Sequence, residues 1–101
     1  MESYCTDKKC DCRKVMINVV NVEKPQEILA TIGFGWETAE YYARWFGDKK
    51  TGQQMVGSYL EPWCIQTSNS ERYLKLTENS FRDKSYIALL KKHYRNFKDV
   101  L

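Results

Sequence analysis

The sequence predicts an α+β fold in which a small antiparallel β-hairpin, or a three-stranded sheet, packs against about four helices. The first observation is a pair of runs rich in β-branched residues, residues 13–22 and 28–34, joined by a polar connection that contains Pro25. The second is a change of period, because from residue 37 onward apolar residues recur three and four positions apart, as on one face of a helix. Since two strands alone are marginal in water, the helices are expected to cover the hairpin.

Chain length and composition predict one folded domain. At 101 residues, of which 43% are hydrophobic and 14% aromatic, the chain is large enough for a single core. The formal net charge of +3 is mild, and no apolar stretch approaches the ~20 residues that span a bilayer, so a soluble, cytoplasmic protein without membrane contact is expected. The domain, residues 1–101, divides into a Cys-rich loop (5–12), a β-hairpin (13–34) and a helical carboxyl-terminal part (37–99).

Alternation of apolar side chains predicts the hairpin. In its first strand Val15, Ile17 and Val19 share one face, and in its second the even-numbered residues from Ile28 to Phe34 share another. Residues 1–4 are long enough only for a strand stub.

Two glycines alternate with aromatic residues at the end of the second strand. Thr38 stands where the third glycine of a G-x-G-x-x-G nucleotide loop would be, so a nucleotide loop is not predicted. A bulged strand end that packs Phe34 and Trp36 into the core is expected instead. A helix over Glu37–Phe46 follows, and Gly47 ends it.

The carboxyl-terminal half predicts three more helices. A short one over Met55–Leu60, preceded by a loop or helix start at Asp48, would end at Pro62, and Trp63 would anchor the loop that follows. A capping box made by Ser68 and Glu71 opens the next helix. The last helix, Lys84–Lys98, is capped by Asp83 and carries an inward stripe made of Tyr86, Leu90, His93 and Phe97.

Three cysteines, Cys5, Cys10 and Cys12, predict a metal site near the amino terminus. Charged residues separate them, so these thiols cannot form a hydrophobic core, whereas a short loop can bring all three sulfurs to one cation. Zinc with thiolate ligands is the usual outcome. Unliganded or redox-active thiols, or a disulfide between Cys5 and one of the others, are the alternatives.

A structural zinc site has four ligands, so a fourth is needed from elsewhere in the chain. The candidates are His93, the sole histidine, and Cys64. His93 is preferred because an imidazole on a buried stripe needs a hydrogen bond or a metal, whereas a thiol packs inertly in a core.

Four segments together resemble a family of small uncharacterised prokaryotic proteins that has no established activity. They are Tyr4-Cys5, the Cys-x-Cys-Arg-Lys-Val run from Cys10 to Val15, the run from Ala30 to Glu37 with its Gly-Trp-Glu turn, and the tail from Leu90 to Lys98 with its His-Tyr pair. The resemblance implies that Cys5, Cys10, Cys12 and His93 belong to the family pattern, and that Cys64 does not. It also implies an additional strand before the first cysteine, so this chain is expected to be shortened and to leave a sheet edge exposed. The Cys-x-Cys pair is similar to half of the SEC-C zinc motif, whose downstream pair this sequence lacks.

Three classes of function remain open. The first and preferred one is a non-enzymatic zinc-binding module that acts in binding or assembly, with a protein partner or a second copy of the chain. The second is a thiol-redox or metal-dependent enzyme, supported by Arg13 and Lys14, which could lower the pKa of Cys12. The third is nucleic-acid binding through exposed Tyr41 or Trp45 and through a basic face of the last helix, made of Lys84, Lys91, Arg95 and Lys98.

Overall fold

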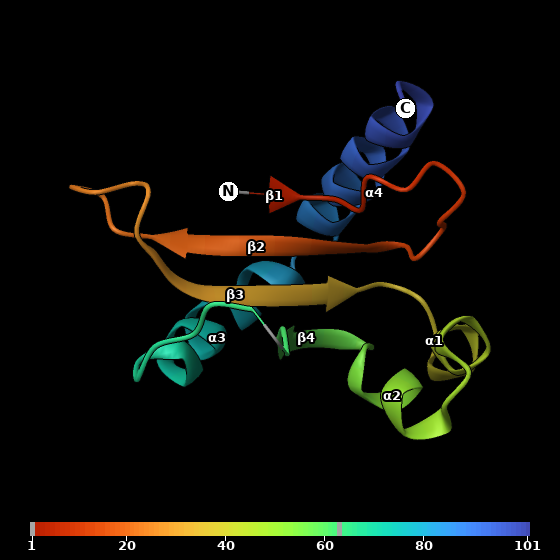
Figure 1. Cartoon of the computed structure of the whole chain (residues 1–101), viewed down its shortest axis with the longest axis horizontal. Coiled ribbons are helices and arrows are strands. Elements are labelled where there is room, and N and C mark those ends of the chain that lie inside the picture. The colour runs from red at the N-terminus through yellow and green to blue at the C-terminus, as the bar shows by residue number, and fades with distance from the viewer. Residues whose placement is uncertain (1, 63) are drawn as a thin grey trace.

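The computed structural model describes residues 2–62 and 64–101 and confirms the predicted α+β class. Figure 1 shows the strands side by side, with α1 and α2 beyond one end of the sheet. In chain order the elements are β1 (Glu2–Ser3), β2 (Lys14–Val20), β3 (Ile28–Gly35), α1 (Ala39–Phe46), α2 (Lys49–Gln54), β4 (Gly57–Leu60), α3 (Ser70–Glu78), the 3-10 helix η1 (Ser80–Arg82) and α4 (Lys84–Asp99). Trp63, the predicted loop anchor, lies outside the described residues.

The sheet has four antiparallel strands in the order β1-β2-β3-β4. The predicted hairpin is confirmed, because Val15 lies opposite Phe34 and Ile17 lies opposite Ile32 in neighbouring strands. The predicted stub before the cysteines is β1, which pairs with β2. The sheet is therefore larger than the hairpin or three-stranded sheet that the sequence predicts.

The prediction of a helix over residues 55–60 is wrong, because residues 57–60 form strand β4. The short helix α2 comes earlier, where the Asp48 carboxylate accepts hydrogen bonds from two backbone N–H groups of its first turn. Gly57 then adopts a positive φ of 72°, which redirects the chain so that β4 pairs with β3. Over so few residues, apolar side chains fit both the helical and the strand spacing. Pairing with the edge of β3 makes this segment a strand.

The other helix ends depend on capping. Gly47 ends α1 with a φ of 71°, and the Asp83 side chain caps α4, both as predicted. The Thr38 side chain caps the start of α1, which the sequence analysis did not predict. The capping box at Ser68 does not form, since α3 starts at Ser70 without a side-chain cap. Among the described residues, no helix is long and apolar enough to cross a membrane.

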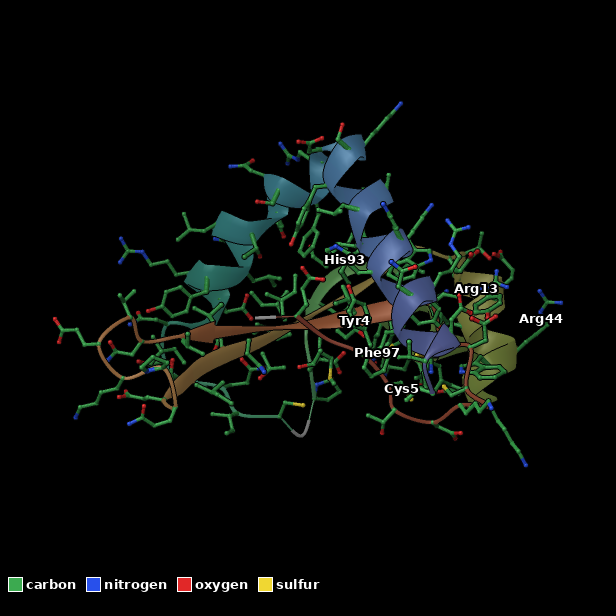
Figure 2. All side chains as sticks on the ribbon, turned by 90° about the horizontal axis from the view of Figure 1, so that it is seen from above. Tyr4, Cys5, Arg13, Arg44, His93 and Phe97 are labelled. Carbon is green, nitrogen blue, oxygen red and sulfur yellow. The ribbon has the colours of Figure 1, made fainter. Side chains whose placement is uncertain are left out.

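Helices cover one face of the sheet. Figure 2, which views the molecule from above, shows α3 and α4 on the same side of the strands. The buried core of this layer consists of Val15, Ile32, Phe34, Phe81 and Leu90. Within it the rings of Phe34 and Phe81 stack at a centroid distance of 4.3 Å. The predicted inward packing of Phe34 and Trp36 is confirmed, since Trp36 packs against this cluster.

The predicted bulge at Gly33 and Gly35 is wrong, because the strand register shifts between Val19 and Val20 instead. Both glycines allow a close approach by other parts of the chain. A Cβ at Gly33 would lie 2.4 Å from a ring carbon of Tyr59, and one at Gly35 would lie 2.1 Å from the backbone oxygen of Met55. These glycines therefore let Tyr59 of β4 and the chain at Met55 approach β3 closely.

Candidate metal centre

The sulfur atoms of Cys5, Cys10 and Cys12 converge, with every pair within 4.8 Å. Cys12 is buried and the other two are half-buried, and all three are free thiols. Tetrahedral ligands with Zn–S bonds of about 2.3 Å place sulfurs about 3.8 Å apart, so a small contraction of this group would enclose a zinc ion. The predicted convergence of the three thiols is confirmed, whereas the identity of the metal is not established by this geometry.

A turn at Asp7 brings Cys10 back toward Cys5. The carboxylate of Asp7 accepts a hydrogen bond from the backbone N–H of Lys9, at 3.0 Å, and its carbonyl accepts one from the N–H of Cys10, at 3.1 Å. Beyond Cys12, Arg13 has a positive φ of 50°, a conformation that costs energy for a residue with a side chain. This residue turns the chain from the loop into β2.

Helix α4 holds the loop from one side. The ammonium group of Lys98 donates hydrogen bonds to the carbonyl oxygens of Cys5, at 3.0 Å, and Asp7, at 2.8 Å. The Tyr94 hydroxyl donates to the Asp11 carboxylate, at 2.8 Å, and accepts from the N–H of Arg13, at 3.1 Å. In Figure 2 Cys5 lies near the carboxyl-terminal turns of this helix, close to Phe97. The positions of the sulfurs are thus fixed by hydrogen bonds that α4 makes with the loop residues between and beside the cysteines.

Helix α1 holds the end of the loop from another side. The Tyr41 hydroxyl donates a hydrogen bond to the Asp11 carbonyl, and the Tyr42 hydroxyl donates one to the Arg13 carbonyl, at 2.7 Å. Tyr42 is fully buried. The sequence alone does not predict that these tyrosines support the site, although both closely follow the Gly-Trp-Glu turn.

The electrostatics of the site do not resemble those of an activated thiol. Burial raises the pKa of Cys12 to about 12, and the neighbouring thiols of Cys10 and Cys5 contribute to the rise. The guanidinium of Arg13 pairs with Asp11, at 3.0 Å, and with Glu37, at 3.1 Å, while the ammonium of Lys14 pairs with Glu61, at 2.8 Å. The two cations that follow Cys12 in the sequence are therefore engaged with carboxylates rather than with the thiol.

His93 does not join the three sulfurs, which corrects the preferred choice of fourth ligand. Its Nδ1 atom lies 3.0 Å from a carboxylate oxygen of Glu2 in β1. Figure 2 shows His93 and Phe97 along α4 with Tyr4 beside them, and the rings of Tyr4 and Phe97 are 5.7 Å apart. The inward stripe of α4 is real, but at the level of His93 it faces β1. Cys64, the other candidate, is exposed and lies outside the cluster as well.

The predicted basic face of α4 is divided among three environments. Lys84 is exposed at the first turn, and Lys98 is bound to the carbonyl groups of the metal loop. Lys91 and Arg95 lie between them and line a cleft.

Comparison with known proteins finds no matching family model, no matching curated protein and no matching solved structure. Fold and site together define an α+β protein with a candidate three-cysteine metal centre.

Proposed function

We propose that Cys5, Cys10 and Cys12 bind one zinc ion and that the protein is a non-enzymatic module acting in binding or assembly. The observation that carries the proposal is the convergence of three free thiols within 4.8 Å. Thiolates are soft ligands and select zinc among the common divalent cations of this kind of site. Metal binding would displace the thiol protons, and the metal–thiolate bonds would offset the cost of deprotonating Cys12, whose pKa burial raises.

The role in assembly is supported by the ligand count. Among residues 2–62 and 64–101, no fourth Cys, His, Asp or Glu side chain joins the sulfur group. Zinc favours four ligands, so the last position would be filled by water or by a side chain of a partner. A ligand from a partner would link two chains through the metal.

Elemental analysis of the purified protein tests the proposal. We expect about one equivalent of zinc per chain, and a chelator should lower the melting temperature because a metal that binds only the folded state stabilises it. Cys10→Ser should lose the metal. Cys64→Ser is the matched control, because it removes an exposed thiol outside the cluster and should keep the metal.

Metal-free protein whose melting temperature is unchanged by added zinc or by chelator would refute the proposal. Equal loss of zinc in both serine variants would show instead that Cys64 supplies a ligand after a rearrangement of its loop.

A further inference from the structure

A cleft of about 370 Å³ lies beside the metal loop. It is bounded by Asp11 and Arg13 at the end of the loop, by Trp36 and Glu37 before α1, and by three residues of α4, namely Lys91, Tyr94 and Arg95. Its volume is at the lower end of the range for small-molecule sites, about 300–1,000 Å³. The cleft contains none of the three thiols, so it is a separate site.

Two cations of the cleft, Lys91 and Arg95, are unpaired among the residues that the structure describes. Arg13 is neutralised by its ion pairs with Asp11 and Glu37. The side chains of Lys91 and Arg95, which lie one helical turn apart on α4, make no ion pair or hydrogen bond with any residue that the structure describes. An arginine fork and a lysine ammonium at this spacing suit a phosphate group.

Two aromatic residues, Trp36 and Tyr94, line the same cleft. The ring of Trp36 meets the ring of Tyr94 edge-on, at a centroid distance of 5.3 Å and an angle of 84°. Trp36 is half-buried and lines the cleft. An indole that lines a cleft can stack on a nucleobase whatever the base, because every base has a π-face.

The carboxylates add acceptors to the same cleft. Arg13 and the Tyr94 hydroxyl hold Asp11 in place, and Arg13 also holds Glu37, and these contacts leave lone pairs on both carboxylates. Carboxylate oxygens accept hydrogen bonds from sugar hydroxyls and from base amino groups. The cleft thus offers cationic hydrogen-bond donors for a phosphate, an aromatic ring for a base, and carboxylate acceptors for sugar hydroxyls and base amino groups.

We propose that this cleft binds one nucleotide unit, with its phosphate on Lys91 and Arg95 and its base against Trp36. The nucleotide is either free or part of a single strand, since both present the same groups. This inference goes beyond the proposed zinc site, although Asp11 and Arg13 are direct neighbours of Cys10 and Cys12 in the chain.

Calorimetric titration with adenosine monophosphate, inorganic phosphate and a short single-stranded oligonucleotide tests the proposal at low ionic strength. The double variant Lys91→Gln and Arg95→Gln should weaken nucleotide binding by at least about tenfold, because it removes two charged hydrogen bonds. The control is Lys84→Gln with Lys92→Gln, which removes the same charge from exposed positions of α4 outside the cleft. It should bind within about twofold of the unmodified protein.

The three ligands distinguish a free nucleotide from a single strand, and inorganic phosphate tests whether the base contributes to binding. Binding of the monophosphate supports a free nucleotide, and binding of the oligonucleotide alone supports a single strand. If neither binds, if inorganic phosphate binds as tightly as the nucleotide, or if both double variants weaken binding equally, the proposal is overturned. Zinc content is measured for every variant and should not change, so a failure of the cleft is distinguishable from a failure of the metal site.

Discussion

At the scale of single residues, the contact between His93 and Glu2 replaces the metal bond that helix periodicity favoured. Burial alone would raise the pKa of Glu2, but hydrogen bonds with Tyr4 and His93 outweigh it and hold the pKa below its ordinary value of 4.5. A carboxylate with a depressed pKa stabilises the folded state above its unfolded-state pKa, and this contribution is lost as the pH falls through the folded-state pKa.

We therefore expect Glu2→Gln to lower the free energy of unfolding at neutral pH and to have no effect well below pH 4.5, where Glu2 is protonated in both states. The loss should be no more than about 1 kcal/mol, because the pair is partly exposed. His93→Ala should show a comparable loss. Denaturant titration across this pH range measures both.

The same histidine variant should keep its full equivalent of zinc, since His93 is not among the converging ligands. Elemental analysis of His93→Ala is the direct comparison with Cys10→Ser. Release of zinc from the histidine variant would reinstate His93 as a ligand and would require β1 to leave its place in the metal-bound state.

The three cysteine ligands could be predicted from sequence because their spacing is local. The side chains that support them could not. Helix periodicity correctly identifies the inward face of α4, but it does not tell which segment lies opposite each turn. That depends on how α4 crosses the sheet, so Tyr94 and Lys98 rather than His93 meet the loop.

At the scale of elements, the hairpin, α1 and α4 could be predicted because each carries its own signals. The hairpin has its alternation, and each helix has a side-chain cap at Thr38 or Asp83. Strand β4 and the start of α3 depend on distant partners instead. The Thr67 and Ser70 hydroxyls, for example, both donate to the Leu29 carbonyl in β3, which places α3 against the sheet.

Two glycine substitutions test how the elements are fitted together. Gly35→Ala should destabilise the protein by roughly 1–3 kcal/mol or more, because its Cβ would lie 2.1 Å from the Met55 backbone oxygen. Gly47→Ala is the control. A Cβ added at Gly47 would meet nothing within 4 Å, so the destabilisation, about 1 kcal/mol, comes only from the positive φ of 71°. Urea unfolding compares the two, and a smaller loss for Gly35→Ala would contradict the close approach to β3.

At the scale of the whole molecule, protection of backbone amides against hydrogen exchange should differ between the strands. Strand β3 is flanked by β2 and β4, whereas β1 comprises only two residues at the edge. We expect amide hydrogen exchange in β3 to be slowest and exchange in β1 and the metal loop to be faster, because edge segments open without global unfolding. Hydrogen exchange followed by NMR measures this order. Equal protection of β1 and β3 would show that the amino-terminal segment opens only with the core.

The contacts between the amino-terminal segment and α4 also bear on the order of assembly during synthesis. Glu2 and His93 are separated by 91 residues in the sequence, and Cys5 and Lys98 by 93. The hairpin closes a short loop and can form as soon as it leaves the ribosome, whereas these contacts must wait until α4 has been translated. The three thiols are therefore translated well before the helix that encloses them, and a nascent chain exposes them to metal and to oxidants until α4 has been made.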